Sequence, residues 1–144
     1  MISVKSLKLV NEKNVKYDFQ KITTPKNIYD VMQKIGATQK AQEYMYILCL
    51  DIKNCINCIA NVGIGSINTA IADKRTVFQY MYLTNSTKMI LVHNHPSGDT
   101  TPSVQDIETT NKINEICKIL DFQLLDHIII SDGSYTSLKE EGVF

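Results

Sequence analysis

The chain has 144 residues, enough for one domain with a sizeable core, and its 15 basic side chains balance its 15 acidic ones. A net charge of zero excludes a sequence-wide basic field that would hold a nucleic acid or an anionic membrane, although a local basic patch stays open. Apolar stretches such as residues 44–50 are too short to cross a bilayer, and residues 1–14 lack the apolar segment of a secretory signal. We therefore expect a cytoplasmic protein whose four cysteines are mostly reduced thiols.

The start of the chain predicts an extension ahead of a single folded domain. Residues 1–21 alternate loosely between apolar and polar side chains, which favours a hairpin around residues 11–14. Thr24 and the proline after it fit the N-cap and first position of a helix, which Gly36 ends. No repeat or linker divides the remainder. We expect a strand or hairpin extension over residues 1–21 and one domain over residues 22–144.

Strands and helices alternate through the middle of the chain. Residues 43–63 predict two strands joined by a tight turn near residues 51–54. A second helix should begin at Asp73 and end near Asn85. Its buried side should carry Val77, Met81 and Tyr82.

The second half of the chain predicts a long helix between two buried strands. Residues 88–95 contain a continuous apolar run, which suggests burial on both faces, and residues 122–131 form a similar strand. A helix of about five turns lies between them. It is marked by Val104, Ile107, Ile113, Ile116, Cys117 and Leu120. Residues 131–134 should form a turn before a short tail. Helices interleaved with apolar strands indicate an α/β protein, with helices packed on the faces of a sheet.

Two histidines at the end of a predicted strand and a carboxylate at the start of the next helix are candidate metal ligands. His93 and His95 are two residues apart, so on a strand both side chains point the same way. Ser103 and Asp106 lie three apart on the first helical turn, so both project from one face. If that turn folds back against the strand end, Asp106 can join the two imidazoles.

Two neutral imidazoles, one carboxylate and an open fourth position are typical of a catalytic zinc site, because structural sites use four protein ligands. Zinc lowers the pKa of water in the open position to roughly 7. The alternative is a helix start, since Ser103-x-x-Asp106 resembles a capping box and Thr101 with Pro102 offers another cap. Those residues alone favour the cap, but the paired histidines favour the metal site.

The spacing His93-x-His95, seven residues, Ser103-x-x-Asp106 resembles the signature of JAMM (MPN+/JAB) zinc metalloproteases, and the string HNHPSGDTTPS resembles their RadC-like branch. GSIN at 65–68, VF at 77–78, LDHIIISDG at 125–133 and the tail YTSLKEEG extend the resemblance to roughly residues 22–144. The resemblance implies a cytidine-deaminase-like, three-layer α/β/α sandwich with a mixed central sheet. It also implies a Zn²⁺ cofactor and hydrolysis of peptide or isopeptide-like amide bonds.

The same resemblance implies two catalytic residues. Glu43 would be the general acid/base, and Ser103 would donate a hydrogen bond to the developing oxyanion. The residues alone do not choose Glu43 over other carboxylates, and a solvated charge at a strand end is the alternative. The other carboxylates are Asp51, Asp73 and Asp126.

The chain departs from the RadC-like pattern in two places. ADKRTVF at 72–78 stands where the family carries a string close to VHPREIF, so Asp73 replaces a histidine and substrate specificity could differ. Longer RadC proteins carry an N-terminal helical module with a DNA-binding hairpin, whereas about twenty strand-like residues precede the domain here. A DNA-repair role therefore rests on the family name only.

The alternative to a hydrolase is a non-catalytic or DNA-associated accessory domain that keeps a zinc site for stability or for binding a partner.

Other candidate ligands favour structural roles. Cys55-x-x-Cys58 lies upstream of the histidines and lacks the proline of the deaminase Pro-Cys-x-x-Cys motif, so packing is favoured over metal or redox chemistry. His127 is expected to be a hydrogen-bonded strand residue rather than a fourth ligand. A supporting role behind the metal is left open for Asp126 or His127. The sequence indicates neither the identity of the peptide or protein substrate nor the oligomeric state.

Overall fold

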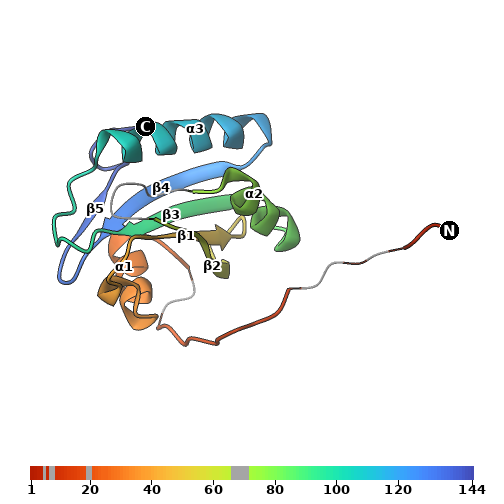
Figure 1. The fold of residues 1–144 in the computed structure, drawn as a ribbon, viewed down its shortest axis with the longest axis horizontal. Coiled ribbons are helices and arrows are strands. Elements are labelled where there is room, and N and C mark those ends of the chain that lie inside the picture. Colours follow the sequence, from red (N-terminus) through yellow and green to blue (C-terminus); the bar gives the residue numbers. More distant parts are fainter. Residues whose placement is uncertain (5, 7–8, 19–20, 66–71) are drawn as a thin grey trace.

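The computed structural model describes residues 1–4, 6, 9–18, 21–65 and 72–144. These residues form an α/β structure with helices on both faces of a sheet (Figure 1), as expected from the sequence. The helices are α1 (Pro25–Lys34), the short 3₁₀ helix η1 (Ala37–Gln39), α2 (Lys74–Leu83) and α3 (Val104–Ile119). The strands are β1 (Tyr44–Leu50), β2 (Ile56–Ile64), β3 (Lys88–Asn94), β4 (Gln123–Ile130) and β5 (Tyr135–Ser137).

The sheet is mixed and has the strand order β2-β1-β3-β4-β5. β1 runs antiparallel to both β2 and β3, and β4 runs antiparallel to β5. β3 and β4 are parallel, and α3 makes the crossover between them. The two parallel strands at the centre are the continuous apolar runs of the sequence, and both are almost wholly buried.

Alternate residues of the strands enter two separate cores. Met45 and Ile47 of β1 and Leu91 of β3 pack in the core that α2 and α3 cover. Leu48 and Val92 enter the opposite core, with α1. Figure 1 shows α1 and α3 on opposite sides of the sheet. His93 has the same parity as Leu91, so its side chain belongs to the α3 side.

The helix starts follow the sequence closely. Thr24 caps α1 in a reciprocal capping box with Asn27. Asp73 caps α2 by accepting a hydrogen bond from the Arg75 N–H. The prediction for Tyr82 was wrong, because 62% of this residue is exposed. It lies one position beyond the buried Met81, and one residue turns a helix by about 100°, which carries Tyr82 off the buried stripe.

Both ends of the chain differ from expectation. The described residues among 1–21 contain no strand and lead away from the body of the domain (Figure 1), so the predicted hairpin was wrong. Exposed apolar side chains such as Val4 and Val10 find no sheet to pack on, and an isolated hairpin is marginal in water. At the other end, the expected tail contains β5, whose Thr136 pairs with Ile129.

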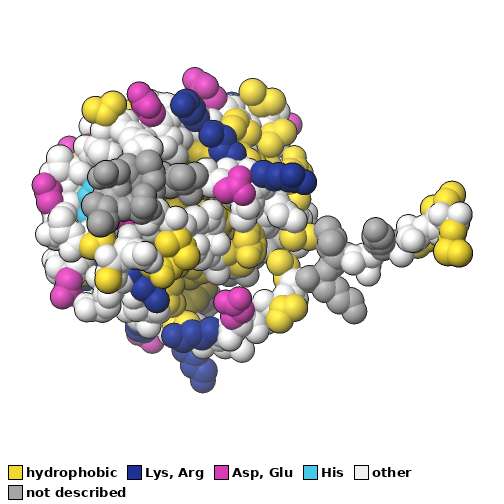
Figure 2. All heavy atoms as spheres, in the orientation of Figure 1, with side chains coloured by type: hydrophobic (Ala, Val, Ile, Leu, Met, Phe, Trp, Pro, Cys, Tyr) yellow, Lys and Arg dark blue, Asp and Glu magenta, His cyan; other side chains and the backbone are white. Residues whose placement is uncertain are grey.

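The charged side chains and the helices of the described part of the chain indicate whether it has a charged surface or a membrane span. Basic and acidic side chains are interspersed on the face that Figure 2 shows. None of the helices among the described residues is long and apolar enough to span a membrane. Within the segments that resemble the RadC-like pattern, residues 66–68 of GSIN lie outside the described residues.

Candidate metal centre

The structure brings His93, His95 and Asp106 together as a group that could hold a metal ion. One ligand atom from each residue lies within 4.8 Å of the others. The two Nε2 atoms are 2.9 Å apart, and the Asp106 oxygens lie 3.2 Å from His93 Nε2 and 3.5 Å from His95 Nε2. His93 is fully buried and Asp106 is 4% exposed, whereas 13% of the His95 side chain reaches solvent. The group therefore opens to solvent on the His95 side.

Strand pairing fixes the two histidines. β3 is held between β1 and β4, and the pairing continues one residue past its end because the His95 N–H donates to the Ile130 carbonyl at 2.9 Å. Between the histidines, the Asn94 side chain points the other way and forms hydrogen bonds with the backbone at the start of β1. Its Oδ1 accepts from the Tyr44 N–H at 2.8 Å, and its Nδ2 donates to the Gln42 carbonyl at 2.9 Å.

Asp106 belongs both to the N-terminal cap of α3 and to the candidate metal group. Ser103 Oγ accepts from the Asp106 N–H at 3.1 Å, and Asp106 Oδ2 accepts from the Ser103 N–H at 2.8 Å. This reciprocal box makes Ser103 the N-cap of α3, so the alternative cap at Thr101 and Pro102 is not used. The box also holds the Asp106 carboxylate toward His93 and His95. The two interpretations of Ser103-x-x-Asp106, cap and ligand, are therefore compatible.

The group is electrostatically coupled. Burial alone would raise the pKa of the Asp106 carboxyl, but hydrogen bonds from His93 and His95 outweigh it and hold that pKa well below its usual range. The hydrogen bond to Asp106 in turn raises the pKa of His95, and the charge of Glu43 acts in the same direction. An ionised carboxylate between two imidazoles is an attractive site for a cation.

The donor set fits Zn²⁺. Zinc prefers imidazole nitrogen and carboxylate oxygen at about 2.0–2.2 Å in a tetrahedron, which puts neighbouring donor atoms about 3.3 Å apart. The separations of 2.9, 3.2 and 3.5 Å among the three side chains bracket that value. Three protein donors leave one tetrahedral position for solvent or substrate. Because the donors already converge, a metal would require little rearrangement of the chain.

A second layer of hydrogen bonds lies behind the histidines. His93 Nδ1 is 2.8 Å from His127 Nε2, and His127 Nδ1 is 2.6 Å from Thr110 Oγ1. Burial lowers the pKa of His127 well below its usual value. His95 Nδ1 is 2.7 Å from the carbonyl oxygen of Asp99. His127 is thus a hydrogen-bonded strand residue that touches a candidate ligand from behind. Sequence reasoning missed Thr110, whose signal was its position one helical turn after Asp106.

Glu43 lies beside the group without belonging to it. Met45 pairs with His93, and the same register continued by two residues beyond the paired strands would set Glu43 opposite His95. The residue is half-buried, and its carbonyl accepts from the Gly65 N–H at 2.8 Å. Ser103 is exposed, and because its oxygen accepts a bond, its own hydrogen can still be donated.

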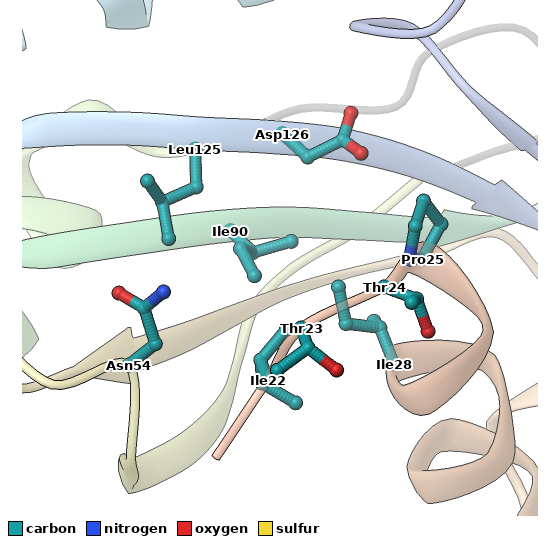
Figure 3. A pocket seen from close by; sticks show the side chains of 9 residues that line it. All are labelled: Ile22, Thr23, Thr24, Pro25, Ile28, Asn54, Ile90, Leu125 and Asp126. Atoms are coloured by element: carbon teal, nitrogen blue, oxygen red, sulfur yellow. The ribbon is translucent and has the colours of Figure 1, made fainter.

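The other carboxylates that the sequence left open have structural contacts elsewhere. Asp51 accepts from two N–H groups of the β1–β2 turn, and Asp73 caps α2. Asp126 lines a small pocket on the α1 face of the sheet, beside Ile90 and the start of α1 (Figure 3). It accepts from the Ser137 hydroxyl at 2.6 Å and from the His127 N–H at 2.7 Å. It therefore lies on the opposite sheet face from the histidines.

The cysteine pair forms no comparable group. Cys55 precedes β2, and Cys58 packs against the core under α2 and α3. All four cysteines are free thiols. Among the described residues, no group of three or more potential ligands includes a cysteine.

Comparison with known proteins identifies the family. A sequence model of the RadC-like JAB domain matches residues 22–143. A UPF0758 protein of Clostridium acetobutylicum is 41% identical over 128 residues, which cover 88% of this chain and 55% of that protein. A UPF0758 protein of Methanosarcina mazei is 46% identical over 123 residues, which cover 85% of this chain and 53% of that protein. The chain spans about half the length of these relatives. Since the match extends over most of its residues, the chain belongs to the RadC-like JAB domain family.

Proposed function

We propose that the protein is a zinc-dependent hydrolase of peptide or isopeptide-like amide bonds. The observation that carries the proposal is the convergence of His93, His95 and Asp106, with Glu43 two residues before Met45, the strand partner of His93. Family membership supports it, because the JAB/MPN superfamily includes metalloisopeptidases. The proposal includes a cytidine-deaminase-like, three-layer α/β/α sandwich and a cytoplasmic location, the latter supported by the free thiols.

Each residue of the group has a role in the proposed reaction. His93, His95 and Asp106 would hold the metal. When bound, Zn²⁺ would supply a Lewis acid that polarises the scissile carbonyl and lowers the pKa of water to about 7. Glu43 takes the proton of the attacking water and passes it to the leaving amine. The Ser103 hydroxyl donates to the developing oxyanion, and the capping box keeps it next to Asp106.

The substrate in this proposal is a peptide or protein. Basic and acidic side chains are interspersed on the face that Figure 2 shows and the net charge is zero, whereas a groove for a nucleic-acid backbone would need an excess of basic side chains. His95 is the ligand whose side chain is partly exposed, so the substrate would approach from its side.

Substitution of Glu43 tests the hydrolase proposal. Glu43→Gln should lower turnover by roughly 10²–10⁴-fold, the usual contribution of a general acid/base, while zinc content stays at the native level. Glu115→Gln, an exposed change on α3, is the matched control and should leave both quantities unchanged. Turnover is followed by mass spectrometry on a mixture of peptides and isopeptide-linked conjugates. Native-level turnover in Glu43→Gln would contradict the assigned role.

Zinc content tests the metal site itself. Protein purified without chelators should carry about one zinc per chain, and His95→Ala should carry far less, because it removes one of three donors. Substoichiometric metal that His95→Ala leaves unchanged would contradict the proposal.

A second candidate is an accessory domain that keeps zinc for stability or for binding a partner. It is favoured by the position of Asp106, which joins the cap of α3 to β3 and would let a metal tie these elements together. In that case Glu43→Gln would leave every function intact. The same substitution therefore separates the two candidates.

A further inference from the structure

Three side chains from three elements form a buried chain of hydrogen bonds behind the candidate metal group. His93 on β3, His127 on β4 and Thr110 on α3 are each fully buried. His93 Nδ1 and His127 Nε2 are 2.8 Å apart, and His127 Nδ1 and Thr110 Oγ1 are 2.6 Å apart. Thr110 Oγ1 is also 2.6 Å from the carbonyl oxygen of Asp106.

The carbonyl at the end of this chain fixes the direction of every bond. A carbonyl oxygen can only accept, so the single hydrogen of the Thr110 hydroxyl points at Asp106 O. Thr110 Oγ1 must then accept from His127, which places a proton on His127 Nδ1. The reverse arrangement would leave two oxygens 2.6 Å apart with no hydrogen between them.

The same logic continues to His93. A fully buried imidazole without a carboxylate among its hydrogen-bond partners is neutral, because burial penalises the charged form. Neutral His127 has one N–H, which is used on Thr110, so its Nε2 is an acceptor. His93 must therefore donate through Nδ1, and Nε2 is the ring nitrogen that faces His95 and Asp106.

We propose that His127 and Thr110 are positioning residues that hold His93 as the Nδ1–H tautomer, with Nε2 presented as the metal-binding atom. The inference rests on the proposed zinc function, because the tautomer matters only if a metal binds at Nε2. Thr110 follows Asp106 by one helical turn, so α3 supplies both a ligand and the anchor that sets the tautomer of another ligand. His95 reaches the same state by a simpler route, with its Nδ1 donating to the Asp99 carbonyl.

The tautomer can be measured without substrate. The chain has three histidines, so long-range ¹H–¹⁵N correlation spectra of the uniformly labelled full chain contain few ring signals. We expect a proton on Nδ1 of His93 in the metal-free protein and again after one equivalent of Zn²⁺. A His93 without a proton on Nδ1 in the native metal-free protein would overturn the inference.

Substitution of Thr110 separates positioning from packing. Thr110→Val keeps the shape but removes the acceptor, so His127 can donate to His93 instead and drive a proton onto His93 Nε2. Zinc affinity, measured by competition with a chromophoric chelator, should fall roughly 10–100-fold, as is typical for partners that orient metal ligands. Thr110→Ser keeps the hydroxyl and should restore both the tautomer and the affinity. Ile113→Val, fully buried on the same helix, is the control and should change neither.

The outcomes distinguish this inference from the proposed function. If His93 carries the Nδ1 proton but no turnover is found, the hydrolase proposal fails and the positioning role stands. If Glu43→Gln abolishes turnover while Thr110→Val keeps the native tautomer and zinc affinity, the hydrolase proposal stands and the positioning role fails. The spectrum of the native protein decides the inference even if Thr110→Val does not fold.

Discussion

Two parts of the molecule carry metal-binding residue types at suggestive spacing, and they differ in what surrounds them. His93 and His95 end a central strand, and the first turn of α3 brings Asp106 to them. Cys55 and Cys58 lie at the β1–β2 turn and on β2, at the edge of the sheet. The spacing of two potential ligands therefore indicates a metal site only where a neighbouring helix or strand supplies a further ligand.

The layer behind the ligands differs as well. Both histidines have Nδ1 within hydrogen-bond distance of a partner, which leaves Nε2 for a metal. Cys58 instead packs against an apolar core, and burial raises its pKa, which disfavours the thiolate that a metal needs. The hydrogen-bond partners of the two histidines therefore favour metal binding, whereas the apolar packing of Cys58 disfavours it.

Thiol reactivity should give the largest effect. Burial raises the pKa of Cys49, the cross-strand neighbour of Cys58, to about 12 and that of Cys117 to about 11. At pH 8 the Cys49 thiolate should be about a thousandfold scarcer than in an exposed cysteine, so alkylation by iodoacetamide should reach half-buried Cys55 first. Peptide mapping over time measures the order. Early disulfide formation between Cys55 and Cys58 would contradict a packing role for the pair.

Metal affinity should separate the two regions next. Asp106→Asn can still accept from the Ser103 N–H, so the cap survives while the charge is lost. We expect zinc affinity to fall by more than about 100-fold, because this change removes a ligand rather than a supporting partner. The double substitution of Cys55 and Cys58 by Ser should leave zinc content at the native level. A loss of zinc in the cysteine variant would reverse the comparison.

Much of this contrast was predictable from residue patterns. Apolar runs located the central strands, and the i, i+2 spacing put both histidines on one face. Local rules also found the caps at Thr24, Asp73 and Ser103, since capping depends on residues within a few positions of each other.

What the sequence left open depends on contacts between distant segments. The partnership of Thr110 with His127 joins α3 to β4, and no local pattern specifies it. The short β5 was expected as tail because three residues carry too little periodicity to mark a strand. Glu43 was chosen by resemblance alone, and only the pairing of Met45 with His93 between β1 and β3 places it near the histidines.

A smaller effect should come from the N-terminal cap of α3, in which Ser103 is paired with the candidate ligand Asp106. Ser103→Ala removes the acceptor for the Asp106 N–H and should lower the free energy of unfolding by about 1 kcal/mol, whereas Ser103→Thr keeps most of it. Zinc content should stay native in both variants, because the Asp106 carboxylate remains. Urea denaturation with zinc analysis measures the two quantities. Loss of zinc in Ser103→Ala alone would mean that the cap, and not only the charge, is needed to hold Asp106.

The pH dependence of the metal-free protein should give the smallest effect and the finest distinction. The raised pKa of His95 contributes stability that is complete below its unfolded value of about 6.5 and is lost as pH rises through the folded value. The lowered pKa of Asp106 contributes stability that is present above about 4 and is lost as pH falls. Both contributions are therefore complete between about pH 4 and 6.5. Cys58, with its raised pKa, lowers stability only above about pH 9, where the unfolded thiol ionises.

Thermal unfolding in the presence of a chelator, from pH 4 to 9, tests this order. The native protein should lose stability as pH rises above about 6.5, and Asp106→Asn should flatten that part of the curve, because His95 then loses the partner that raises its pKa. Substitution of Cys58 by Ser should leave the curve unchanged below about pH 9. Parallel curves for native protein and Asp106→Asn would mean that the His95 and Asp106 charges are not coupled in the folded chain. In that case, the contrast between the two regions would rest on the convergence of the three side chains and on the hydrogen bonds behind the histidines.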